Sequence, residues 1–277
     1  MGKTIRDIRY ADRSARNVLD LMLPDGVTNP PLVVFIHGGA FRMGDKTDCL
    51  PERTALLQAG FAVASVNYRY STEAIWPAQL DDLKSAFALL RKMGHELGYD
   101  PDRMASFGPS AGGHLSASIA IALSADPHTS LDACIVWFAP VDFPTMDSDI
   151  EATGVARATG RNDAAGSPES VLIGATVSEN HALARQAGPI ARLADLPAGA
   201  HLPDMLIMHG ALDPYIGAGQ ARGLHAAIAA FGTASKLDLD ILPEGTHGGG
   251  AFEWPQTMDK VVAFLKSSFA RAERRIA

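Results

Sequence analysis

Residues 103–117 read RMASFGPSAGGHLSA, and this stretch decides the fold. An apolar run up to Phe107 is typical of a short strand, and the small residues from Ser110 to Ala125 are typical of a helix. Between them lies the G-x-S-x-G pattern from Gly108 to Gly112, which needs tiny neighbours because the serine sits on a tight strand-to-helix turn. The turn exposes the hydroxyl beside a helix N-terminus, where negative charge is favoured. The pattern therefore predicts Ser110 as a nucleophile.

A second motif, His37-Gly38-Gly39-Ala40, follows the continuous β-branched run Leu32–Ile36, which is typical of a buried strand. Acyl transfer to a serine builds an oxyanion, which preorganised backbone N–H groups stabilise. Glycines let such a loop approach closely, and the residue after the nucleophile supplies a further amide. We expect the oxyanion hole to consist of the amides of Gly39, Ala40 and Ala111.

A serine hydroxyl needs a base to become a nucleophile. Where the serine lies on a G-x-S-x-G turn, the acid and then the histidine follow it in chain order. Asp213 follows the apolar run Met205–Met208, and His247 comes just after the run Leu237–Leu242. Both positions lie where strands end at their carboxyl edge, which is where open α/β sheets place their sites. We predict the triad Ser110, Asp213 and His247. Asp142 remains a competitor for the acid because it follows the strand predicted at Ala133–Ala139.

Apolar runs alternate with helical patterns along most of the chain, which predicts a mostly parallel sheet with helices on both faces. The alternation lapses between about Pro144 and Pro203 and then resumes. We therefore expect one domain over residues 1–277, with a partly helical cap insertion at about 144–203 that builds the substrate pocket. Expected strands are 17–23, 32–36, 61–66, 103–107, 133–139, 205–208 and 237–242, and expected helices are 51–59, 77–97, 110–125, 180–187, 217–231 and 256–270.

Composition limits the remaining classes of function. Hydrophobic residues make up 47% of the 277 residues and charged residues 20%, which suits a globular protein with a sizeable buried core. The net charge of -7 disfavours nucleic acid as a partner. The sequence shows neither a signal-peptide pattern nor a run of about 20 apolar residues that would span a membrane. With only Cys49 and Cys134 as cysteines, we expect no disulfide framework and a cytoplasmic location. A homodimer stays open.

The other histidines carry no catalytic context. His37 and His209 are expected to hold loops by hydrogen bonds, and His114 lies on the predicted helix after the nucleophile. No clustered metal-ligand spacing and no G-x-G-x-x-G after a strand occur, so we predict no metal and no cofactor.

Taken together, these motifs resemble the bacterial α/β-hydrolase esterases related to the hormone-sensitive-lipase group, and most of all the feruloyl/acetylxylan esterase type. This resemblance implies the α/β-hydrolase fold and hydrolysis of carboxylic esters through Ser110, Asp213 and His247. The matching pieces are residues 19–21, 37–41, 44–46, 67–70, 77–79, 100–103, 108–114, 142–143, 180–190, 209–214 and 245–248.

The predicted function is that of a serine carboxylesterase that hydrolyses a small ester, with a short or aromatic acyl group, through an acyl-enzyme. An amidase of the arylformamidase type is the alternative, because the same catalytic residues and a similar His-Gly-Gly loop would serve it. A non-catalytic binding protein on the hydrolase fold is a third class, which usually lacks members of the triad.

Overall fold

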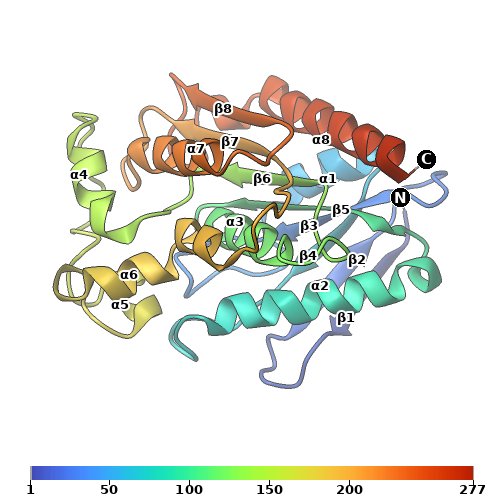
Figure 1. The fold of residues 1–277 in the computed structure, drawn as a ribbon, viewed down its shortest axis with the longest axis horizontal. Coiled ribbons are helices and arrows are strands. Elements are labelled where there is room, and N and C mark those ends of the chain that lie inside the picture. Colours follow the sequence, from blue (N-terminus) through green and yellow to red (C-terminus); the bar gives the residue numbers. More distant parts are fainter. Residues whose placement is uncertain (1, 277) are drawn as a thin grey trace.

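The structure is a computed structural model that describes residues 2–276, with the side chains of the last helix described as far as Arg271. Eight strands form one sheet in the order β1-β2-β4-β3-β5-β6-β7-β8 (Figure 1). Strands β1 and β2 run antiparallel to their neighbours, and all later pairs are parallel. The strands are β1 (Thr4–Arg9), β2 (Val18–Met22), β3 (Pro31–Ile36), β4 (Ala62–Val66), β5 (Asp100–Pro109), β6 (Ala133–Trp137), β7 (Asp204–Gly210) and β8 (Leu237–Leu242).

Helices cover both faces of the sheet, which confirms the predicted α/β class. They are α1 (Leu50–Gln58), α2 (Ala78–Leu97), α3 (Ala111–Leu123), α4 (Met146–Glu151), α5 (Pro168–Ile173), α6 (His181–Ala187), α7 (Gly219–Phe231) and α8 (Pro255–Ile276), with short 3-10 helices η1 (Phe143–Thr145), η2 (Val177–Glu179), η3 (Pro189–Asp195) and η4 (Ala251–Glu253). None of the helices in the described part of the chain has the length and apolar character that crossing a bilayer requires.

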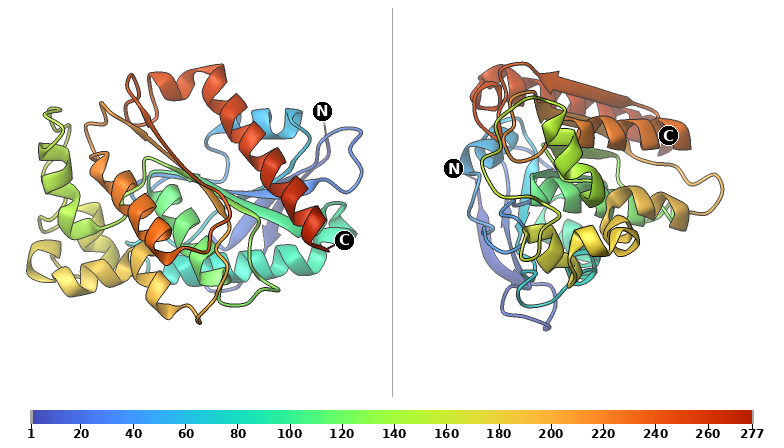
Figure 2. Two further views of the ribbon diagram at one scale, coloured as in Figure 1. Left: turned by 45° about the horizontal axis from the view of Figure 1, so that its top comes forward. Right: turned by 90° about the vertical axis from the view of Figure 1, so that its left-hand side faces the viewer.

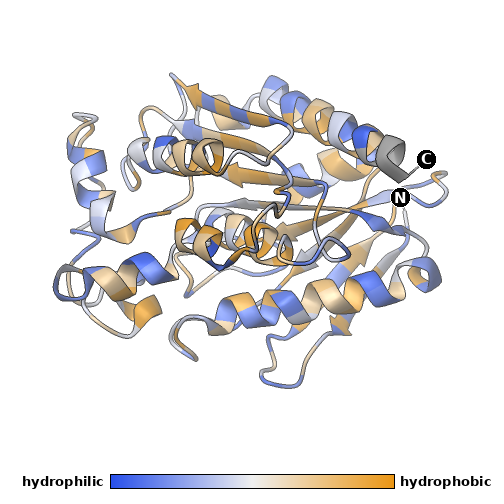
Figure 3. Cartoon of the chain, viewed as in Figure 1, coloured by the Kyte–Doolittle hydropathy of each residue, from blue (hydrophilic) through white to orange (hydrophobic). Residues whose placement is uncertain are grey.

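Two apolar cores lie on opposite faces of the sheet, because successive side chains of a strand point to opposite sides. On β3, Val33 and Phe35 pack with α1 and α8, whereas Leu32, Val34 and Ile36 pack with α2, α3 and α7. Figure 3 shows the central strands as largely apolar, while α2 and α8 carry polar residues as well. The continuous apolar runs of the sequence therefore correspond to strands that are buried on both faces.

The structure differs from the sequence-based expectation at strands β1, β5 and β7. Strand β1 was not predicted, because its sequence TIRDIR contains only two apolar residues, Ile5 and Ile8. It forms an exposed edge by antiparallel pairing with β2. Strand β5 is longer than the predicted run and begins at Asp100, and β7 extends to Gly210.

The segment of residues 144–203, which we call the cap segment, contains short helices and no strand within its described residues. Figures 1 and 2 place α4, α5 and α6 together beyond one end of the sheet. The predicted helix at 180–187 is present as α6, whereas the apolar residues Val171-Leu172-Ile173 belong to α5. The assignment of this segment as an insertion within a single domain stays a prediction.

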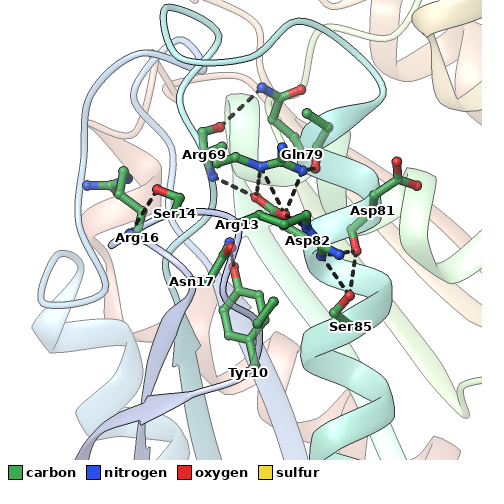
Figure 4. A network of polar contacts seen from close by, with 12 residues as sticks. Tyr10, Arg13, Ser14, Arg16, Asn17, Arg69, Gln79, Asp81, Asp82 and Ser85 are labelled. Atoms are coloured by element: carbon green, nitrogen blue, oxygen red, sulfur yellow. Dashed lines mark hydrogen bonds and ion pairs between the residues drawn. The ribbon is translucent and has the colours of Figure 1, made fainter.

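A buried carboxylate ties the start of the chain to helix α2 (Figure 4). Asp82 is fully buried, and both of its oxygens accept hydrogen bonds from the guanidinium of Arg69 at 2.9–3.1 Å. Arg13, in the turn between β1 and β2, donates to the same carboxylate at 3.2 Å. The backbone N–H of Arg69 adds a further bond at 3.0 Å. Charge and hydrogen bonds together satisfy a group that burial would otherwise destabilise.

Replacing Asp82 with Ala should lower the free energy of unfolding by about 3 kcal/mol, because the Arg69 guanidinium would lose its buried partner. Urea unfolding followed by circular dichroism measures the change. Asp81→Ala is the matched control, since this carboxylate is the exposed neighbour on the same helix. Equal stability losses in the two variants would contradict the role assigned to the buried network.

Candidate active site

The turn at Ser110 has an unusual backbone conformation. Ser110 lies between β5 and α3 with φ 55° and ψ −125°, a region that non-glycine residues rarely adopt. Its N–H donates to the carbonyl of Trp137 at 2.8 Å, which anchors the turn to β6. A Cβ at Gly108 would lie 2.2 Å from the Gly112 carbonyl oxygen, and one at Gly112 would lie 2.0 Å from the Ile36 oxygen. Both positions therefore require glycine, as the motif predicts.

Three side chains form a continuous chain of hydrogen bonds at this turn. Ser110 Oγ lies 3.0 Å from His247 Nε2, and His247 Nδ1 lies 2.7 Å from Asp213 Oδ2. Asp213 is only 1% exposed, and its other oxygen accepts the N–H groups of Tyr215 and Ile216 at 2.8 and 3.0 Å. A carboxylate can only accept, so the geometry fits a His247 that donates from Nδ1 and accepts the hydroxyl proton at Nε2. The structure thus brings together the three residues predicted as the triad.

The competing acid, Asp142, has other partners. Its backbone N–H donates to the side-chain oxygen of Gln220 at 2.8 Å, and its carboxylate lies 3.7 Å from the guanidinium of Arg185. Burial raises the pKa of the Asp142 carboxyl. These contacts involve α7 and α6, whereas the carboxylate in contact with His247 is that of Asp213.

The loop after β3 lies directly against the nucleophile turn. A Cβ at Gly38 would lie 3.0 Å from the Pro109 carbonyl oxygen and 3.4 Å from Ser110 Cβ. Gly39 and Ala40 have positive φ values of 108° and 52°. In the part of the chain that the structure describes, no backbone acceptor is found for the amides of Gly39, Ala40 or Ala111. The three residues that carry these amides lie in the wall of one cavity together with Ser110.

His37 stabilises this loop through its contacts with Gly38 and Tyr68. Its ring stacks on Tyr68 with 4.4 Å between ring centroids, and its Nδ1 lies 2.7 Å from the Gly38 carbonyl oxygen. Arg16 places a guanidinium nitrogen 3.3 Å from His37 Nε2 and donates to the Gly44 carbonyl at 3.1 Å. Burial lowers the pKa of His37 to about 4, so the ring is neutral at pH 7. Sequence reasoning assigned no role to either residue: Arg16 belongs to no local motif, and Tyr68 entered only as part of the matching piece 67–70.

His209 and His114 are likewise structural groups. His209 Nε2 lies 2.8 Å from the carbonyl oxygen of Ile216, so it braces the loop that carries Asp213. His114 is fully buried on α3, and its Nδ1 lies 2.9 Å from the Pro140 carbonyl oxygen. Burial lowers the pKa of both histidines, to about 4 for His114. These contacts agree with the loop-holding role expected for His209.

The geometry agrees with a comparison of the chain with known protein families. The family model described as BD-FAE matches residues 19–228. The chain belongs to the BD-FAE family. Its matched region contains the loop after β3, the Ser110 turn and Asp213, and His247 lies beyond it.

Individual relatives of this BD-FAE member carry esterase names. Esterase LipQ of Mycobacterium tuberculosis is 27% identical over 95% of this chain and 61% of its own length. The probable carboxylic ester hydrolase LipM of the same organism is 31% identical over 78% of this chain and 50% of its own length. The chain therefore spans about half to three-fifths of the length of these curated relatives.

Among solved structures, a truncated carbohydrate esterase from gut microbiota is similar over 97% of this chain and 96% of its own length. Its TM-score is 0.82 and its sequence identity 27%. The arylesterase structure, with a TM-score of 0.74 and 22% identity, has the same fold. The sheet and these neighbours establish the α/β-hydrolase fold that the sequence predicts.

In this BD-FAE member, Ser110 and His247 open into a cavity of about 860 Å³. The size is that of a site for a small organic molecule. The loop of Gly39 and Ala40 lines one part of its wall, and the cap segment contributes residues 159–162 and 164–169. The cap segment therefore borders the same cavity as Ser110.

Glu169 is an unusual member of this wall. It lies in the first turn of α5 and is only 5% exposed. Burial raises its pKa to about 7, with the charge of Asp147 acting in the same direction and that of Arg42 opposing it. The folded protein therefore binds a proton at Glu169 more tightly than an unfolded chain does.

Because the pKa of Glu169 is raised in the folded protein, the free energy of unfolding decreases as the pH rises. Relative to Glu169→Gln, the wild-type protein should lose up to about 3 kcal/mol of unfolding free energy between pH 4.5 and pH 7, and little more above pH 7. Denaturant unfolding of both proteins across this range measures the difference. Glu96→Gln on the exposed side of α2 is the control for the general effect of replacing a glutamate by a glutamine. A parallel course for wild type and Glu169→Gln would contradict the assignment.

Proposed function

We propose that this chain is a serine carboxylesterase that hydrolyses a small carboxylic ester through an acyl-enzyme. The observation that carries the proposal is the hydrogen-bonded chain from Ser110 through His247 to Asp213, which opens into a cavity whose wall includes Gly39, Ala40 and Ala111. The esterase names of the relatives favour the same chemistry.

The geometry supports a two-step reaction. Ser110 Oγ attacks the ester carbonyl while His247 Nε2 takes its proton, and Asp213 holds the imidazole and balances its positive charge. The amides of Gly39, Ala40 and Ala111 stabilise the oxyanion. The alcohol leaves with the proton from His247, which leaves the acyl group on Ser110. Water, activated by His247, then attacks the acyl-enzyme and releases the acid.

An amidase would use the same residues, because both reactions pass through the same oxyanion. The names of the relatives favour the ester. Comparing rates on matched aryl esters and N-formyl anilides separates the two activities, and faster turnover of the anilide would replace the ester proposal.

The cap segment is proposed to select the substrate, since residues 159–162 and 164–169 line the cavity with Ser110. Loops at this edge of an α/β sheet commonly determine specificity. The oligomeric state and the cytoplasmic location stay predictions from the sequence.

Ser110→Ala should reduce kcat on p-nitrophenyl acetate by on the order of a million-fold and abolish labelling by a fluorophosphonate, because the attacking oxygen is gone. Stopped assays and mass spectrometry of the labelled protein measure both effects. Ser118→Ala is the control, because this serine is buried on the same helix away from the turn. Near-native turnover by Ser110→Ala would end the proposal.

Asp213→Asn should lower kcat by roughly 10⁴, because the amide can stabilise the wrong tautomer of His247. Asp142→Asn, the matched substitution at the competing acid, should act on the melting temperature and leave the large part of the turnover in place. Measuring both quantities for both variants decides between the acids. The assignment is wrong if activity is lost in Asp142→Asn and kept in Asp213→Asn.

A further inference from the structure

Two polar side chains of the cap segment line the catalytic cavity although they are almost completely buried. Asn162 is 8% exposed and Glu169 is 5% exposed. Asn162 lies in the loop before α5, and Glu169 lies in its first turn. Glu169 belongs to the part of the wall that follows Ser167, whose hydroxyl caps α5 by accepting the Ser170 N–H at 3.1 Å. The local backbone around Glu169 is thereby fixed.

Each of these side chains has a polar atom without a partner among the described residues, namely Oε2 of Glu169 and Nδ2 of Asn162. The neighbouring carboxylate of Asp147 is fully used: it accepts the N–H groups of Asn162 and Asp163 at 3.0 and 2.9 Å and pairs with Arg157. The Asp147 network is therefore complete without the unpartnered atoms of Asn162 and Glu169. A buried unpaired polar group is costly, and its presence in a folded protein calls for a ligand or a water.

The chemistry of the two groups favours a hydroxyl as that ligand. A hydroxyl oxygen can accept a hydrogen bond from the amide of Asn162, and a hydroxyl hydrogen can be donated to the carboxyl of Glu169. A cationic substituent would need an ionised Glu169, and both burial and the negative charge of Asp147 disfavour ionisation. Arg42, which also lines the cavity, adds a positive charge that would repel a cation.

We propose that Asn162 and Glu169 form a hydrogen-bonding subsite of the catalytic cavity that takes a hydroxyl group of the ester substrate. The proposal rests on the esterase function proposed above and names the substrate feature that the cap segment selects. Both unpartnered atoms are themselves buried. Binding therefore requires rotation about the terminal torsions, which are broad in Asn and Glu side chains and need no change of backbone. Glu52, another carboxylate of this cavity with an unpartnered oxygen, is less buried.

Matched ester pairs test the subsite. Glycerol 1-acetate and propyl acetate differ in hydroxyls on the alcohol side, and methyl 3-hydroxybutanoate and methyl butanoate differ in one on the acyl side. For each pair, kcat/KM is measured with wild type, Glu169→Leu, Asn162→Leu and Glu169→Gln. Glu96→Leu is the control for the first variant, because it makes the same change on the exposed side of α2.

In at least one pair, wild type should prefer the hydroxylated ester, and the ratio of the two kcat/KM values should fall about tenfold in Glu169→Leu and in Asn162→Leu. Glu169→Gln, whose amide oxygen still accepts, should keep most of the ratio, and Glu96→Leu should keep all of it. Asn162→Leu provides an independent result if Glu169→Leu does not fold.

Three results would overturn the subsite: wild-type ratios near one in both pairs, ratios unchanged in the Leu variants while both rates fall together, or a stronger preference for acetylcholine than for glycerol 1-acetate. Failure of the esterase function itself has a different signature. In that case wild type hydrolyses none of the esters and Ser110 is not labelled by a fluorophosphonate, which refutes the subsite as well.

Discussion

The site depends on one backbone constraint, the close approach of β3, the Ser110 turn and helix α3. Gly112 lies so near the Ile36 carbonyl that a Cβ would stand 2.0 Å from that oxygen, and Ser110 is held at a positive φ of 55°. Such a conformation is unfavourable by itself and persists because surrounding contacts fix it. The bond from Ser110 N–H to Trp137 and the buried strands on either side supply that support.

Parallel pairing explains why residues far apart in sequence meet at this turn. Strands β3, β5, β6, β7 and β8 end at the same edge of the sheet, so the loops that follow them are neighbours. The loop after β3 provides amides, the loop after β7 provides Asp213, and the loop after β8 provides His247. Buried histidines fix two of these loops in place: His37 supports the first and His209 the second.

The cap segment is organised around polar contacts, whereas the sheet is held by apolar packing on both faces. The carboxylate of Asp147, in α4, accepts hydrogen bonds from two backbone N–H groups of the loop before α5 and pairs with Arg157. Polar groups thus organise this wall, and the protein tolerates a buried Glu169 with a pKa of about 7 beside its catalytic cavity. Buried polar atoms without a partner lower the stability of the folded protein. Such a loss is consistent with a functional surface, where these atoms can form hydrogen bonds to a ligand.

The sequence by itself determined the fold class and the tight turn at Ser110, and it predicted the chain order of Ser110, Asp213 and His247, because these depend on local signals. Apolar runs mark strands that are buried on both faces, and the glycines of G-x-S-x-G mark a turn that tolerates no Cβ. Only the tertiary structure shows which of the two loops reaches His247: both Asp213 and Asp142 follow strands, and the carboxylate in contact with His247 is that of Asp213. The tertiary structure also decided the roles of Arg16 and Tyr68, the pairing of the polar strand β1, and the burial of Asn162 and Glu169, because each of these arises from contacts between segments that no local pattern encodes.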